Sequence, residues 1–181
     1  MVYVSIGLLL VGAVTALNLV LVLAVIRRLR RHEEERKKLF GVEIPESGPS
    51  VGEPLPAFTA VATDGTLVDS EALRGREASL TFLSTECSVC EVAVEHLPEA
   101  ARLAGMDATQ MVVVIAGEET KAREMTAPLD GVAKVVLEEA AGPLSTLYAI
   151  KATPTTVMVD PDGTVTHASA GTNPVLDRLP A

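Results

Sequence analysis

Hydrophobic residues follow two different patterns along the chain, and the first predicts a membrane span. Residues 4–26 form a mostly apolar run rich in Leu, Val, Ile and Ala, and no charged side chain occurs before Arg27. A helix of this length crosses a hydrocarbon core about 30 Å thick. One transmembrane helix is therefore expected, as a membrane anchor at residues 1–27. A cleaved signal peptide and a buried core helix are the alternatives, although a signal peptide carries a basic N-terminal region that this run lacks.

The residues after the apolar run change in composition twice. Residues 27–38 hold seven of the fifteen basic side chains, and residues 41–56 are rich in Pro and Gly. Basic side chains at this place contact anionic lipid headgroups, and a Pro-rich stretch acts as a stiff spacer. We therefore expect residues 28–56 to be a basic juxtamembrane segment followed by a linker.

The second pattern, in which short apolar runs alternate with amphipathic stretches, occupies residues 57–181. The spacing predicts strands at 78–83, 111–116, 132–137, 155–159 and 164–168, and helices at 87–104, 118–129 and 142–149. The sequence Asp160-Pro161-Asp162-Gly163, between the last two strands, is typical of a hairpin turn. This order predicts one α/β domain with a mixed central sheet and helices on both faces.

Charge divides the chain at nearly the same place. Residues 1–40 carry seven basic and three acidic side chains, whereas residues 41–181 carry eight and twenty-one. Binding to nucleic acid needs clustered Lys and Arg to displace the counterions of the phosphates. An acidic domain disfavours such a partner, and we expect no nucleic acid to bind.

The chain has two cysteines, Cys87 and Cys90, which form a single C-x-x-C where a predicted strand meets a predicted helix. The N–H groups and positive dipole end of a helix start stabilise a thiolate. The spacing also lets the second thiol attack a mixed disulfide formed by the first. The pair therefore predicts a redox-active dithiol, with Cys87 as the attacking sulfur and Cys90 as the resolving one, and without a bound cofactor or metal.

Other chemistries of a cysteine pair fit this sequence less well. A zinc site needs four ligands, and His96 and His167 do not have the spacing of a zinc finger. Covalent haem attachment needs His at position 91, which is Glu. A purely structural disulfide stays open as an alternative, although so short a loop constrains little unfolded-chain entropy.

Two segments of the chain resemble the thioredoxin superfamily. They are FLSTECSVC at residues 82–90, directly after an apolar strand, and ATPTTVMVDPDG at residues 152–163. In this order they are similar to the membrane-anchored TlpA/ResA-like thioredoxins and to the MauD-like accessory proteins of methylamine utilisation. The likeness covers about residues 50–171, and the layout of anchor and linker matches.

The resemblance implies a thioredoxin-like fold preceded by the transmembrane helix. It also implies that Thr153-Pro154 is a cis peptide bond that faces the dithiol, which leaves the backbone of Thr153 free to pair with an extended substrate strand. An ordinary proline at the start of a strand is the alternative for Pro154.

Three carboxylates are candidates for tuning the dithiol. Glu86 stands where the family usually has Trp, and Glu91 follows the second cysteine. Both oppose the helix dipole and are expected to raise the pKa of Cys87. Glu118 resembles an acidic residue near the dithiol of ResA-like proteins, which makes it a candidate proton acceptor; a carboxylate that complements the start of a helix is the alternative.

The leading hypothesis is a membrane-tethered thiol–disulfide oxidoreductase that acts on protein disulfides, with client proteins and a redox partner, in maturation of a partner protein. Ser88 and Val89 influence the redox potential without revealing the direction of transfer. One alternative is a peroxiredoxin-like peroxidase, for which Ser84 fits but Leu80 stands in place of the expected Pro. Another is a redox-inert, membrane-bound assembly factor or adaptor.

Two observations disagree on which side of the membrane the domain lies. The basic residues after the anchor favour a cytoplasmic domain, because Lys and Arg flanks tend to stay inside. The resemblance implies an extracytoplasmic domain, where disulfide chemistry on clients is needed. We expect a single-pass protein of the cell membrane with its domain on the extracytoplasmic side.

Overall fold

The computed structural model describes residue 12, residues 47–171 and residues 173–176. The predicted anchor and the basic segment lie outside this part, apart from Gly12. Among the helices of the described residues, none combines the length and the apolar character that crossing a membrane requires.

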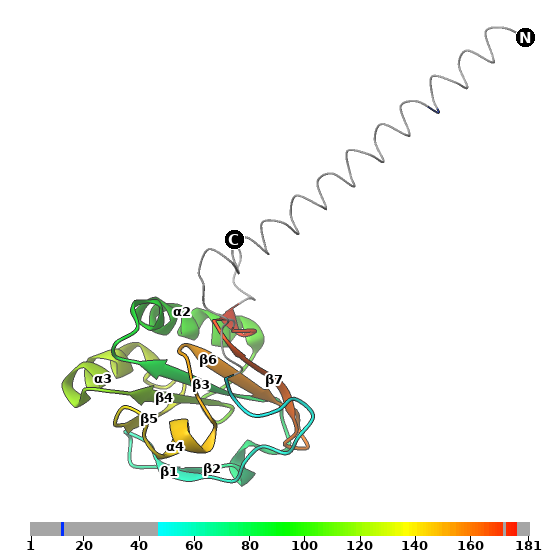
Figure 1. The fold of residues 1–181 in the computed structure, drawn as a ribbon, viewed down its shortest axis with the longest axis horizontal. Helices are drawn as coiled ribbons and strands as arrows, with labels where there is room; N and C mark the ends of the chain where they lie inside the picture. The colour runs from blue at the N-terminus through cyan, green and yellow to red at the C-terminus, as the bar shows by residue number, and fades with distance from the viewer. Residues whose placement is uncertain (1–11, 13–46, 172, 177–181) are drawn as a thin grey trace, which may run out of the picture. The chain divides into compact units, whose positions relative to one another are not determined.

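A five-stranded mixed sheet forms the centre of the domain, in the order β5-β4-β3-β6-β7 (Figure 1). The first three strands along the chain are parallel, and the last two are antiparallel to their neighbours. The strands are β3 (Ala78–Ser84), β4 (Met111–Ala116), β5 (Lys134–Glu138), β6 (Thr155–Val159) and β7 (Val165–Ala170). β3, β4 and β6 are buried along nearly their whole length, which explains their continuous apolar runs.

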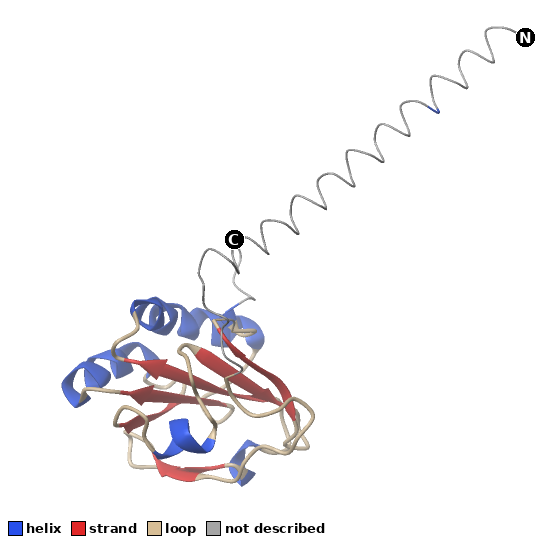
Figure 2. Ribbon diagram, viewed as in Figure 1, coloured by secondary structure: helices blue, strands red, loops and turns tan. Residues whose placement is uncertain are grey.

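The two faces of this sheet are covered differently (Figure 2). One face packs against α2 (Ser88–Ala104), α3 (Glu119–Thr126) and a 3-10 turn η2 (Ala127–Leu129). The other packs against α4 (Pro143–Leu147), η1 (Glu71–Leu73) and a small antiparallel sheet of β1 (Thr59–Val61) and β2 (Leu67–Asp69). The prediction of a mixed sheet with helices on both faces is therefore confirmed.

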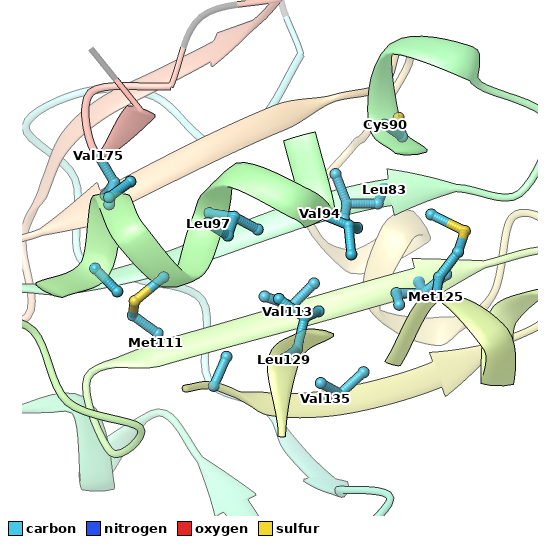
Figure 3. Close-up of a cluster of buried hydrophobic side chains, with 14 of the residues drawn as sticks. Leu83, Cys90, Val94, Leu97, Met111, Val113, Met125, Leu129, Val135 and Val175 are labelled. Atoms are coloured by element: carbon cyan, nitrogen blue, oxygen red, sulfur yellow. The ribbon is translucent and has the colours of Figure 1, made fainter. Parts of the chain in front are cut away.

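Each face has its own apolar core. Beneath α2, Leu97 packs with Leu83, Val113 and Leu129 (Figure 3). On the opposite face, the ring of Tyr148 contacts two phenylalanine rings, and its hydroxyl donates to Pro56 O at 2.8 Å. Both faces of the sheet are thus packed at β3, the strand that precedes the two cysteines.

The structure differs from the prediction at the end of one helix and at two short strands. The predicted helix 118–129 ends at Thr126 and continues as η2, because Pro128 has no N–H to continue the helical bonding. β1 and β2 were not predicted. Each has three residues, and the apolar side chains of Val61 and Leu67 are exposed, so the apolar positions do not mark the buried face of either strand.

The residues expected to be the end of the linker are packed onto the domain. We call residues 47–55 the strap. Gly52 N donates to Val165 O at 2.8 Å, Val165 N donates to Glu53 O at 2.9 Å, and Pro54 forms a bridge with Thr164. The strap, which is cyan in Figure 1, therefore extends the edge at the start of β7, where a chain with few N–H groups is tolerated.

Candidate dithiol site

Cys87 lies in the short turn between the end of β3 and the start of α2. Its backbone is extended, and it is the N-cap of the helix, the position usually held by Ser, Thr, Asp or Asn. Its Sγ accepts a hydrogen bond from Cys90 N at 3.2 Å. Cys87 and Cys90 are joined by a disulfide. The predicted helix start is confirmed, and it brings the backbone N–H of Cys90 to Cys87 Sγ.

The two sulfurs differ in their access to solvent. Cys90 is 0% exposed and packs in the core between α2 and the sheet, near Leu83 and Val94 (Figure 3). Cys87 is half-buried, and its neighbours Glu86 and Ser88 are exposed. An approaching disulfide therefore meets Cys87 before Cys90.

The loop before β6 lies beside this pair. Thr153-Pro154 is a cis peptide bond, as the resemblance implied. Phe82 of β3 pairs with Thr155 of β6, so the residues that precede Thr155 continue toward the end of β3. Thr153 O lies 3.5 Å from Cys87 Sγ, where the S–H of the dithiol form would donate to it. The backbone of Thr153 is thus directly next to the more accessible sulfur.

A lysine of α3 that sequence reasoning missed contacts the dithiol helix and the turn before it. Lys121 Nζ is 3.1 Å from Glu91 Oε1, and it donates to Thr85 O at 2.5 Å. The charge of Glu91 is therefore paired, whereas Glu86 forms no ion pair within the described part of the chain. No sequence pattern pointed to Lys121, because its two partners lie about thirty residues before it on another element.

Thr85 connects the dithiol turn to the loop after β4. Its side chain is buried, its N–H donates to Ala116 O at 3.0 Å, and its Oγ1 accepts from Glu118 N at 3.2 Å. Gly117 has a φ of +135°, and a Cβ at that position would collide with the Thr85 side chain. The turn before Cys87 is therefore held tightly against the start of α3.

Glu118 is the N-cap of α3 rather than a free base. Its carboxylate accepts from Lys121 N at 2.9 Å and from Thr120 N at 2.8 Å. These two backbone hydrogen bonds hold its pKa below the ordinary value. A carboxylate with a lowered pKa is a weak proton acceptor, so the structure favours the helix-start interpretation of Glu118.

Metal binding has no support among the described side chains, since no three His, Cys, Asp or Glu residues within 47–171 and 173–176 gather closely enough to hold an ion.

The fold and the dithiol beside a cis-proline loop define a thioredoxin-like protein with the site of a thiol–disulfide oxidoreductase. A family model described as Redoxin matches residues 50–178. The chain belongs to the Redoxin family and is related to the MauD proteins, and its fold is thioredoxin-like.

Two sequence relatives are methylamine utilization proteins MauD. The one from Methylophilus methylotrophus is 30% identical over 158 residues, which are 85% of this chain and 71% of the relative. The one from Methylobacillus flagellatus is 29% identical, over 85% of this chain and 73% of the relative. Both matches extend over most of each protein.

Solved structures share the fold at lower identity. The thioredoxin domain of a thiol-disulfide oxidoreductase from Bacteroides vulgatus is 19% identical, with a TM-score of 0.57 over 71% of this chain and 93% of that one. A thiol:disulfide interchange protein from Chlorobium tepidum is also 19% identical, with a TM-score of 0.57 over 71% and 92%. These likenesses support the thioredoxin-like fold.

Proposed function

We propose that this chain is a membrane-tethered thiol–disulfide oxidoreductase that exchanges electrons with protein disulfides through Cys87 and Cys90. The observation that carries the proposal is the unequal access of the two sulfurs at the start of α2, with the backbone of Thr153 beside the accessible one. The likeness to MauD supports a role in maturation of a partner protein.

The exchange takes two balanced steps. The Cys87 thiolate attacks one sulfur of a client disulfide, a bond forms between the two sulfurs, and the other client sulfur leaves and takes up a proton. The Cys90 thiol then loses its proton and attacks Cys87 Sγ, which releases the second client thiol and forms the Cys87–Cys90 disulfide. The client gains two electrons and two protons. The reverse steps oxidise a client dithiol, and the redox potential of the pair decides the direction.

Charge near the pair sets how easily Cys87 loses its proton. Donation from Cys90 N and the helix dipole favour the thiolate. Glu86 is exposed next to Cys87 and is expected to raise the pKa of the thiol. Lys121 offsets the charge of Glu91, so we expect Glu86 to have the larger effect of the two carboxylates.

Reduction of insulin tests the proposed activity. The wild-type full chain, with dithiothreitol as the reductant, is expected to speed precipitation of the insulin B chain, and Cys87→Ser is expected to match the rate without protein. Equal rates for the two chains contradict the proposal and favour a redox-inert assembly factor. Rapid consumption of hydrogen peroxide that needs Cys87, without insulin reduction, favours the peroxiredoxin-like alternative.

The membrane part of the proposal has its own test. We propose that residues 4–26 anchor the chain and that the domain is extracytoplasmic. After mild reduction of intact cells, a membrane-impermeant maleimide is expected to label Cys87, with Cys87→Ser as the unlabelled control. Labelling only after the cells are permeabilised places the domain inside, and extraction of the full chain by alkaline carbonate contradicts the anchor.

A further inference from the structure

The strap contacts the residues on both sides of the cis peptide bond Thr153-Pro154. Ser47, its first residue, is 4% exposed. Its Oγ lies 2.9 Å from Thr155 Oγ1, 3.0 Å from Lys151 N and 3.4 Å from Ala152 N. One hydroxyl from the N-terminal side of the domain therefore contacts three residues that surround Thr153-Pro154.

The direction of each hydrogen bond follows from the donors available. Thr155 has a single hydroxyl proton, which it donates to Ala152 O at 2.7 Å. Ser47 must therefore donate its own proton to Thr155 Oγ1. The lone pairs of Ser47 Oγ accept from Lys151 N and, with weaker geometry, from Ala152 N. The hydroxyl uses its whole hydrogen-bonding capacity on this loop.

These bonds tie both ends of the cis dipeptide to the strap. Lys151 and Ala152 precede Thr153, and Thr155 follows Pro154. Close packing supports the same contact, since a Cβ at Gly48, whose φ is +102°, would lie 3.1 Å from Ala168 Cβ. The position of Thr153 O, 3.5 Å from Cys87 Sγ, therefore depends on a residue outside the sheet and outside the dithiol helix.

We infer that Ser47 is a positioning residue for client binding, because it holds the Thr153-Pro154 loop in the place where the backbone of a client segment pairs beside Cys87. The inference rests on the proposed function. Ser47 is far along the chain from the dithiol and is expected to act on the binding of an extended client, with no effect on the reactivity of the Cys87 thiolate.

Two disulfide probes separate these effects. The first is an extended peptide whose single cysteine carries thionitrobenzoate as a mixed disulfide; attack by Cys87 on the peptide sulfur releases the coloured thionitrobenzoate. The second is the small aromatic disulfide dithiobis(nitrobenzoate), which has no backbone to pair with Thr153. The reduced full chain in mild detergent is mixed with each probe, and the rate is followed against probe concentration.

Ser47→Ala is expected to raise the peptide concentration at half-maximal rate about fivefold, the effect of one hydrogen bond. The limiting rate and the rate with the small disulfide are expected to stay as in wild type. Ser50→Ala removes an exposed hydroxyl of the same strap and is the matched control, expected to equal wild type. A Ser47→Ala chain with the half-saturation of wild type, or with equal losses on both probes, overturns the inference.

A second pair of variants, at Thr155, tests the inference even if Ser47→Ala does not fold. Thr155→Val removes the hydroxyl and keeps the shape, so it is expected to behave like Ser47→Ala, whereas Thr155→Ser is expected to behave like wild type. If Ser47→Ala fails to fold, this pair decides, and equal half-saturation for its two members overturns the inference. A wild type that reacts with the small disulfide without saturating on the peptide contradicts the client-binding part of the proposed function instead.

Discussion

Reduction of the Cys87–Cys90 disulfide is expected to leave the domain folded, because the bond closes a very short loop. The cysteines are three positions apart in the sequence. In the chain-entropy treatment, a loop of this length lowers the entropy of the unfolded chain by an amount that is worth about 2 kcal/mol at 25 °C. A structural disulfide across a long loop contributes about 3–5 kcal/mol. Because the loop is short, reduction of the disulfide can lower the free energy of unfolding only slightly.

A second contribution acts in the opposite direction. Cys87 Sγ caps α2 by accepting from Cys90 N at 3.2 Å, and a thiolate accepts such a bond more strongly than a disulfide sulfur. N-cap hydrogen bonds contribute about 1 kcal/mol. The reduced form recovers part of the loss through this cap, so we expect reduction to lower the free energy of unfolding by less than about 2 kcal/mol.

Urea unfolding of the full chain in mild detergent, oxidised and reduced, measures this difference. The double variant Cys87→Ser/Cys90→Ala is the control, since Ser is also a good N-cap and Ala places no polar group in the core around position 90; its stability is expected to be close to that of the reduced wild type. A loss above about 4 kcal/mol, or unfolding on reduction alone, would show that the disulfide is a structural staple and would refute the reasoning.

Three further predictions concern the surroundings of the site. Lys121→Met is expected to shift the alkylation of Cys87 to higher pH, because the negative charge of Glu91 loses its partner. Adding Glu91→Gln to this variant is expected to reverse most of the shift. An unchanged pH profile for Lys121→Met would show that Lys121 does not affect the pKa of the thiol. Because the pKa of Glu118 is lowered by folding, its contribution to stability is present above its ordinary pKa of 4.5 and is lost as the pH falls through the folded pKa. Acid unfolding of Glu118→Gln is therefore expected to be less steep than that of wild type, and parallel curves speak against the cap. Tyr148→Phe keeps both ring contacts but removes the donor to Pro56 O, so thermal unfolding is expected to show a loss of about 1 kcal/mol; no loss means that this bond is not stabilising.

The sheet and its helices were predictable because burial leaves a direct signal in the sequence. The run Val112–Ile115 is continuously apolar since β4 lies between two covered faces, and α2 shows a helical period since one side of it packs on the sheet. The C-x-x-C could be placed at the start of α2 because it lies where the apolar run of β3 ends and the helical period of α2 begins. The cis bond of Thr153-Pro154 came from the resemblance, and the structure has it.

The contacts that shape the site from a distance left no such signal. Lys121 reaches Thr85 O and Glu91 only because α3 packs beside the start of α2, and a lysine on an exposed helix face is otherwise ordinary. Ser47 lies in a stretch whose Pro and Gly content is typical of a linker, yet those residues suit an edge segment beside β7. Side-chain contacts between remote segments depend on the completed fold.

The central claim is that Cys87 makes the bond to the client and Cys90 breaks it. Intact-mass measurement after mixing each single-cysteine variant with the peptide that carries thionitrobenzoate tests this claim most directly. The account predicts that Cys90→Ser gains the mass of the peptide and keeps it, since no resolving thiol is present, and that Cys87→Ser stays unmodified because Cys90 is buried. Stable attachment of the peptide to Cys87→Ser, equal to or above that of Cys90→Ser, would contradict it.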